Sequence, residues 1–147
     1  MRKLSKISSV GRIIDANLNR AKEGLRVCEE VARFILGSVK LTSDFKKTRH
    51  AIDTLMRQLP IYRALINERK SDSDVGKNIY ASELIRKDYK DIFFANIQRV
   101  KESLRVLEEF SKLFDAKTAI KFKELRYRLY GIEKEAVKGI ASLRNHR

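Results

Sequence analysis

Residues 16–31 read Ala-Asn-Leu-Asn-Arg-Ala-Lys-Glu-Gly-Leu-Arg-Val-Cys-Glu-Glu-Val, and residues 95–110 read Ala-Asn-Ile-Gln-Arg-Val-Lys-Glu-Ser-Leu-Arg-Val-Leu-Glu-Glu-Phe. Ten of the 16 positions are identical, where about one match would be expected by chance. A weaker match follows each copy: Phe45, Lys46, Arg49 and Ile52 correspond to Phe122, Lys123, Arg126 and Leu129. The sequence therefore predicts an internal duplication, with repeats at about residues 12–59 and 91–136.

Both repeats carry mainly apolar residues at alternating spacings of three and four, the period of one face of an α-helix. The second helix of each repeat has this spacing between residues 45 and 59 or between residues 122 and 136. We therefore expect an all-α bundle built from a two-helix unit used twice. The first helix of each repeat carries the series Ile14, Leu18, Ala21, Leu25, Cys28, Ala32 and Ile35, or Phe93, Ile97, Val100, Leu104, Leu107, Ser111 and Phe114.

Local signals predict where these helices end. Gly37 should end the first helix, because glycine adopts the left-handed conformation of a helix C-terminus without strain. Pro60 should interrupt the second helix. The polar stretch that follows has no periodicity, and we expect a linker between the halves at about residues 67–87. The candidate N-terminal caps are Thr42 or Ser43 for the second helix, Ser82 or Asp88 for the third, and Asp115 or Thr118 for the fourth.

The composition limits the class of protein. A chain of 147 residues fits a single domain, residues 1–147. The net charge of +14 favours anionic partners: phosphorylated metabolites, nucleotides, nucleic acid or anionic lipid. The single cysteine, Cys28, excludes an internal disulfide framework. No run approaches the roughly 18 apolar residues that span a membrane, so we expect a soluble, cytoplasmic protein.

A second helical face is also alike in the two copies. Opposite the apolar stripe lie Ala16, Arg20, Glu23, Val27 and Glu30, which match Ala95, Arg99, Glu102, Val106 and Glu109, with Asn17 and Asn96 at the border. One interpretation is structural: ion pairs along each helix, or packing between halves or subunits. The other is a polar cleft near the pseudo-two-fold axis. There Arg would bind phosphate, and Glu would hold Mg²⁺ or orient a hydroxyl.

The linker contains a second candidate, formed by Arg69, Asp74, Val75 and Gly76. An ordinary polar turn would explain these residues. The length of the loop and its position between the halves favour a functional role. No Walker A or Gly-x-Gly-x-x-Gly pattern occurs. Cys28 lies in the apolar stripe, which predicts a buried residue rather than a nucleophile.

Four stretches together resemble a known family: residues 15–30, Ser-Asp-Val-Gly at 73–76, residues 95–109, and Leu-Arg-Tyr-Arg-Leu-Tyr at 125–130. They are similar to the helical domain found alone or in front of the barrel in some bacterial thiamine-phosphate synthases. The resemblance implies an ATP-dependent, Mg²⁺-requiring kinase of thiamine biosynthesis, which converts hydroxymethylpyrimidine phosphate to the diphosphate. A barrel needs about 200 residues or more, so we expect the free-standing form, with a functional link to the synthase.

If this activity holds, the two phosphorylated substrates call for several positive charges. The candidate phosphate- and substrate-binding residues are Asn17, Arg20, Arg49, Arg69, Gly76, Asn96, Arg99 and Arg126. Glu23 and Asp74 are the candidate Mg²⁺ ligands, and Asp74 and Glu102 the candidate catalytic residues. Asp74 would orient the acceptor phosphate, which is already ionised and hardly needs a strong base.

Two other functions stay open at this point: a basic module that binds nucleic acid, and a non-catalytic adaptor. The interleaving of Arg with Glu argues against nucleic acid as a partner, since a recognition helix presents a basic face separated from acids. The oligomeric state is also open, with a homodimer as one alternative.

Overall fold

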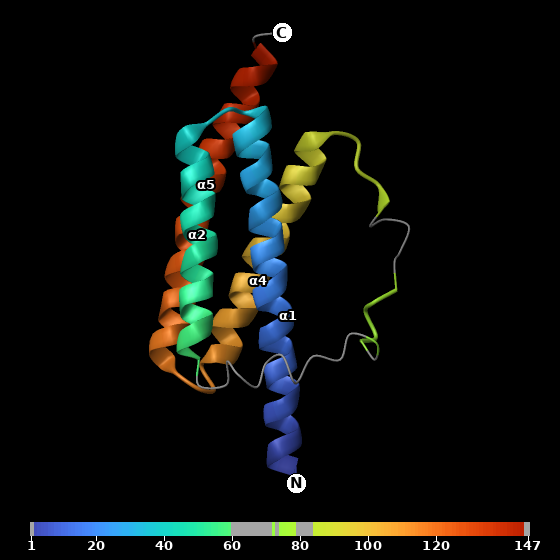
Figure 1. Ribbon diagram of the computed structural model, residues 1–147, viewed down its shortest axis with the longest axis vertical. Coiled ribbons are helices and arrows are strands. Elements are labelled where there is room, and N and C mark those ends of the chain that lie inside the picture. Colours follow the sequence, from blue (N-terminus) through green and yellow to red (C-terminus); the bar gives the residue numbers. More distant parts are fainter. Residues whose placement is uncertain (1, 60–71, 73, 79–83, 146–147) are drawn as a thin grey trace.

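The computed structural model describes residues 2–59, 72, 74–78 and 84–145, and within them the regular elements are helical (Figure 1). This confirms the predicted all-α bundle. None of the helices in these ranges is long and apolar enough to span a membrane. The elements are α1 (Arg2–Glu30), the short π-helix η1 (Val31–Ile35), α2 (Val39–Gln58), α4 (Tyr89–Ser111) and α5 (Ala116–Asn145).

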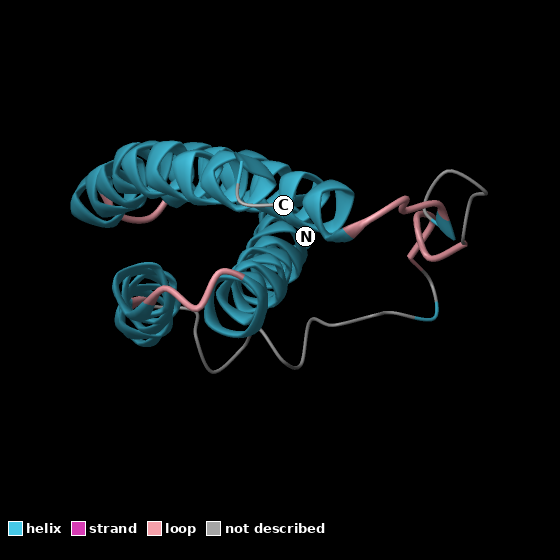
Figure 2. Cartoon of the chain, turned by 90° about the horizontal axis from the view of Figure 1, so that it is seen from above, coloured by secondary structure: helices cyan, strands magenta, loops and turns pink. Residues whose placement is uncertain are grey.

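The four long helices pack as a closed set. The most extensive contact joins α1 to α4, while α2 packs on α1, α5 packs on α4, and α2 also contacts α5. Figure 2 views the bundle from above. The colour gradient of Figure 1 shows that α1 and α4 run in opposite directions. One face of the α1–α4 pair is covered by α2 and α5, which leaves its other face available for a binding site.

The predicted apolar stripes form the core, as amphipathic helices require. Leu18, Leu25 and Leu104 are at most 1% exposed. Phe45 packs edge to face on Phe93, with ring centroids 6.2 Å apart. The fully buried large side chains are Phe45, Phe93, Phe122, Ile14, Leu18, Leu25, Ile52, Ile97, Leu104, Leu107 and Leu129.

The prediction for Ile35 was wrong, because this residue is 42% exposed. The cause is η1, in which each turn is wider than an α-helical turn. Leu36 N donates to Val31 O at 3.0 Å, five residues back. The wider turn moves Ile35 off the stripe that the three–four spacing predicts.

The ends of the helices follow mostly the expected chemistry. Gly37 has φ +61°, as predicted. Asp88 caps α4 by accepting from the backbone N–H groups of Lys90 and Asp91. Asp115 precedes α5 and accepts hydrogen bonds from the Lys117 N–H and the Thr118 hydroxyl.

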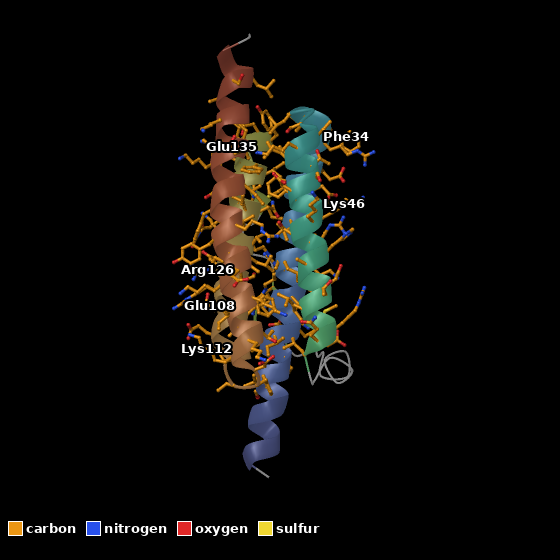
Figure 3. The ribbon with its side chains drawn as sticks, turned by 90° about the vertical axis from the view of Figure 1, so that its left-hand side faces the viewer. Phe34, Lys46, Glu108, Lys112, Arg126 and Glu135 are labelled. Atoms are coloured by element: carbon orange, nitrogen blue, oxygen red, sulfur yellow. The ribbon has the colours of Figure 1, made fainter. Side chains whose placement is uncertain are left out.

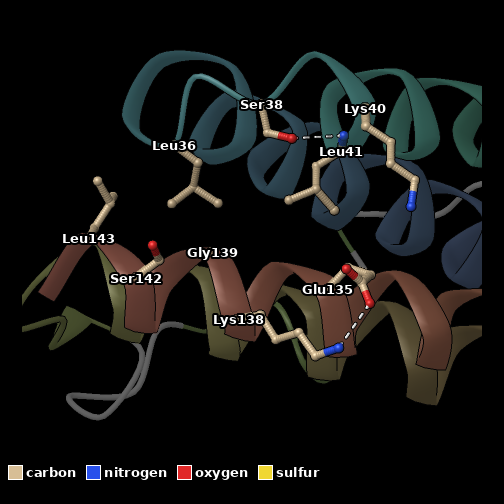
Figure 4. A pocket seen from close by; sticks show the side chains of 9 residues that line it. All are labelled: Leu36, Ser38, Lys40, Leu41, Glu135, Lys138, Gly139, Ser142 and Leu143. Atoms are coloured by element: carbon tan, nitrogen blue, oxygen red, sulfur yellow. Dashed lines mark hydrogen bonds and ion pairs between the residues drawn. The ribbon is translucent and has the colours of Figure 1, made fainter. Parts of the chain in front are cut away.

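The cap of α2 was predicted wrongly. It is Ser38, whose Oγ accepts from Leu41 N at 3.1 Å (Figure 4), so the helix begins several residues before Ser43. Thr42 instead donates its hydroxyl to the carbonyl of Ser38 at 2.6 Å. Pro60, Ser82 and most of the linker lie outside the described residues.

The helices α1 and α4 approach each other closely at Gly24. A Cβ atom at this position would lie 2.6 Å from Val100 Cγ2 and 2.9 Å from Asn96 O. Both distances are shorter than a side chain tolerates, so glycine is required for the backbones to approach this closely. The contact lies one turn from Arg20 on α1 and three residues from Arg99 on α4.

Candidate functional site

A pocket of about 680 Å³ lies on α1, bounded also by the linker and α4. It brings together six of the predicted site residues: Asn17, Arg20, Glu23, Asp74, Gly76 and Arg99. The rest of its lining consists of Ser9, Arg12, Ile13, Asp15, Ala16 and Asn19. A polar pocket therefore lies on the repeated face of α1, but of the matching face on α4 only Arg99 lines it.

The helical period explains why these side chains meet. Ala16, Arg20 and Glu23 are spaced by four and three residues and share one face of α1. Leu18 and Leu25 point to the buried side of the same helix, at most 1% exposed. Burial of the apolar stripe thus turns the opposite face toward the linker and α4.

The pocket carries charges of both signs. Arg12, Arg20 and Arg99 supply three guanidinium groups, whose planar forks suit phosphate oxygens. Asp15, with 7% of its surface exposed, is its most buried acid. Glu23 also lines the pocket and is exposed. Arginines from two helices in one pocket suit an anionic ligand such as a phosphorylated compound.

The linker residues form a turn that also lines the pocket. Asp74 Oδ1 accepts from Gly76 N at 2.8 Å, and Asp74 O accepts from Lys77 N at 3.3 Å. This is the ordinary polar turn that the sequence left open. Since Asp74 and Gly76 border the pocket as well, the two interpretations are compatible.

Asn17 and Asn96 make the same local hydrogen bond. Asn17 Nδ2 donates to Ile13 O at 2.8 Å, and Asn96 Nδ2 donates to Ile92 O at 2.7 Å. Only Asn17 lines the pocket. The repeated Asn therefore has the same structural role in both halves, but only Asn17, in the first half, lies at the pocket.

Arg126 is not brought to this pocket. Its Nη2 lies 2.9 Å from Oε1 of Glu108, whose side chain is 5% exposed (Figure 3). This hydrogen bond, followed by one to Tyr130, raises the pKa of Arg126 above its ordinary value. Arg105 also pairs with Glu108.

The same arrangement occurs in the first half. Arg49 Nη2 lies 3.3 Å from Oε1 of Glu29, and Arg26 Nη1 lies 2.9 Å from Oε2 of the same buried carboxylate. Arg26 also pairs with Glu30 at 3.4 Å, as the structural interpretation predicted. This part of the repeated signature holds α2 to α1, and Arg49 is not among the residues that line the pocket.

Glu102 faces a different groove, a pocket of about 420 Å³ between α4 and α5. Its Oε1 accepts from Gln98 Nε2 at 3.1 Å, and Arg126 and Tyr130 line the same groove. A further pocket of about 440 Å³ lies between Leu36 and Leu41 on one side and α5 on the other (Figure 4). It contains none of the predicted site residues. Arg69 lies outside the described residues.

Comparison with known proteins shows the family. The model of the ThiD2 family matches residues 12–135. The chain belongs to the ThiD2 family. A thiamine-phosphate synthase of Synechocystis sp. is 41% identical over 127 residues, which are 86% of this chain and 36% of that protein. A thiamine-phosphate synthase of Rhodopirellula baltica is 40% identical over 136 residues, 92% of this chain and 36% of that protein.

This member of the ThiD2 family thus spans about a third of the length of the curated relatives it matches. A thiamine-phosphate synthase of Nostoc punctiforme gives the same proportion, with 40% identity over 125 residues, 84% of this chain and 34% of that protein. No solved structure matches the chain.

Sequence reasoning missed four polar residues of the pocket in this member of the ThiD2 family: Ser9, Arg12, Asp15 and Asn19. It searched for positions that are the same in both repeats, and these positions differ between them. One signal was available, since Asp15 lies about 60° from Leu18 in the helical projection and so borders the apolar stripe. An acid at such a position needs a polar reason to be there.

Two carboxylates of the pocket, Glu23 and Asp74, are the predicted magnesium ligands. Among the described residues there is no group of three or more His, Cys, Asp or Glu side chains placed to hold a metal. Magnesium commonly takes only one or two carboxylates and completes its shell with phosphate oxygens and water. Glu23 and Asp74 line the same pocket, and their role as magnesium ligands stays a prediction.

Cys28 has no part in the site. It is fully buried, and burial raises the pKa of its thiol to about 12. Its Sγ lies 3.9 Å from the carbonyl oxygen of Phe93. A thiol that stays protonated in the core is not a nucleophile, which agrees with the expectation from sequence.

Proposed function

We propose that the chain acts in thiamine biosynthesis and transfers a phosphoryl group from ATP to hydroxymethylpyrimidine phosphate in the pocket on α1. Membership of the ThiD2 family and relatives named thiamine-phosphate synthases support the pathway. The observation that carries the proposed reaction is the convergence of Arg20 and Arg99, from two helices, on a pocket that also contains Asp74.

The reaction makes modest demands on the protein. An oxygen of the substrate's phosphate attacks the γ-phosphorus of ATP, a new P–O bond forms, and the bond to the leaving ADP breaks. Both reacting groups are anionic, so the main tasks are to hold them in line and to offset their charge. Arg12, Arg20 and Arg99 offset that charge in this proposal.

The carboxylates take the remaining roles. Glu23 and Asp74 would hold magnesium, which would neutralise negative charge on the phosphates. Asp74 sits in a turn in which its Oδ1 accepts a hydrogen bond from Gly76 N, which suits a residue that orients the acceptor phosphate. Glu102 faces the neighbouring groove, and its catalytic role stays a prediction. The diphosphate product would be consumed by a thiamine-phosphate synthase.

The test is direct. The purified chain is incubated with ATP, Mg²⁺ and hydroxymethylpyrimidine phosphate, and the diphosphate and ADP are quantified. Arg20→Ala and Arg99→Ala should each lower kcat/KM about 10- to 100-fold, the cost of one charged hydrogen bond. The control is Arg57→Ala, an exposed arginine in the last turn of α2, which should stay within about twofold.

The same assay separates the alternatives. An adaptor without a site would form no product, and neither arginine variant would change any ligand response. A kinase that uses the groove beside Arg126 instead would tolerate Arg20→Ala and Arg99→Ala. Either result would refute the proposed site.

A further inference from the structure

The lining of the pocket on α1 is centred on one small residue, Ala16. On the surface of a helix, the nearest neighbours of a residue lie three and four positions away, and the next ones along the same face lie seven away. The residues at all of these spacings before and after Ala16 line the pocket: Ser9, Arg12, Ile13, Asn19, Arg20 and Glu23. The helical projection therefore places the methyl group of Ala16 at the middle of the pocket floor, with longer side chains around it.

This floor is apolar, while its rim is charged and polar. Ala16 and Ile13, both half-buried, are the apolar side chains among the described residues of the lining. Arg12 lies one turn before Ala16 and Arg20 one turn after it, about 12 Å apart along the helix axis. An apolar surface between two guanidinium groups fits the face of a planar ring that carries an anionic group, because apolar contact holds the ring while the charged rim orients it.

The second repeat provides a comparison within the chain. Ala95 is the counterpart of Ala16 on α4 and is also half-buried, but it does not line this pocket. Four residues before it stands Asp91, where the first half has Arg12, and the Asp91 carboxylate accepts a hydrogen bond from Lys87 N at 3.1 Å. The small residue therefore occurs in both halves, but arginines flank it on both sides only in the first.

We propose that Ala16 determines the specificity of the pocket for a phosphorylated single aromatic ring, which is the pyrimidine of the proposed reaction. The face of the ring lies on the methyl group of Ala16 and on Ile13, and the phosphate extends toward Arg20 and Arg99. Burial of the ring face against this floor adds affinity that the charged groups alone do not supply. This inference deepens the proposed function and rests on it.

The experiment replaces Ala16 with leucine and measures binding by calorimetry. Alanine and leucine are both strong helix formers, so the change fills the floor without removing a charge or weakening the helix. The probes are hydroxymethylpyrimidine phosphate, methyl phosphate, which has no ring, and ATP. The wild type should bind the pyrimidine at least about tenfold more tightly than methyl phosphate. Ala16→Leu should lower the affinity for the pyrimidine at least about tenfold, and those for methyl phosphate and ATP less than about threefold, because neither of these places a ring on Ala16.

The matched control is Ala95→Leu, the same change at the counterpart position outside the pocket, which should leave all three affinities unchanged. An unchanged affinity of Ala16→Leu for the pyrimidine would overturn the inference. An equal loss for all three probes, or a loss confined to ATP, would overturn it as well.

The wild type decides the question if Ala16→Leu does not fold. Equal affinities of the wild type for the pyrimidine and for methyl phosphate would overturn the inference, since the ring would then contribute nothing to binding. The proposed function would survive that result if the diphosphate is still formed. A wild type that forms no diphosphate would instead refute the proposed function itself.

Discussion

Replacing Glu108 with alanine should destabilise the bundle far more than the same change at its neighbour Glu109. The Glu108 side chain is 5% exposed, and its Oε1 lies 2.9 Å from Nη2 of Arg126, which is 13% exposed. Removing the carboxylate leaves the largely buried Arg126 guanidinium without its anionic partner, in contact with the Tyr130 hydroxyl at 3.0 Å and with the Tyr127 ring at 5.1 Å from its centroid. Loss of one partner of a buried ion pair costs about 3–5 kcal/mol.

Glu109 gives the matched comparison. It contacts Arg105 at 3.1 Å and Lys112 at 2.8 Å, but its side chain is 43% exposed. These contacts lower the pKa of its carboxyl, the hydrogen bond from Lys112 being the main cause. Water replaces such contacts readily, so Glu109→Ala should change the free energy of unfolding by no more than about 1 kcal/mol.

The assay is urea unfolding followed by circular dichroism. With a slope of about 2 kcal/mol/M, Glu108→Ala should lower the midpoint by roughly 2 M, while Glu109→Ala shifts it by at most about 0.5 M. The double variant Glu108→Leu/Arg126→Met should recover most of the loss, because it leaves no buried charge without a partner. Equal midpoints for the two alanine variants, or no recovery in the double variant, would refute the reasoning.

Two further predictions concern the core. Gly24→Ala should destabilise the protein by about 1–3 kcal/mol in the same assay, since its Cβ would meet the backbone oxygen of Asn96 at 2.9 Å; an unchanged midpoint would mean that α1 and α4 are not held this closely. Cys28 has a pKa raised to about 12, so the folded state keeps its proton while the unfolded thiol ionises near 9. The folded state therefore loses stability as the pH rises from about 9 to 12, and the midpoint of Cys28→Ala should fall less steeply there than that of the wild type; parallel curves would contradict the burial argument.

The sequence predicted the core and the polar face of α1 because both depend on helical period alone. A helical projection of α1 alone separates Leu18 and Leu25 from Arg20 and Glu23. In the structure the two leucines are buried and the two charged residues line a pocket. The duplication itself stays a prediction, although Glu29 and Glu108 make matching ion pairs.

Other features depend on contacts between helices, which a projection does not contain. Arg49 was assigned to phosphate, but its neighbour across the helix contact is Glu29, and only the packing of α2 on α1 reveals this. The position of Ile35 depends on the π-helix, which the spacing of apolar residues did not signal. Asp15 was missed because the search relied on what the two repeats share.

The contact at Gly24 also bears on the entropy of binding. Arg20 and Arg99 come from helices that pack so closely at Gly24 that Val100 Cγ2 and the Asn96 carbonyl oxygen take the space of a Cβ atom, and this packing fixes how far apart the two helices stand. An anion entering between these arginines does not have to pull their supports together. The two helices are already held at this distance in the folded protein. Ligand binding therefore loses less conformational entropy, and more of the interaction energy appears as affinity.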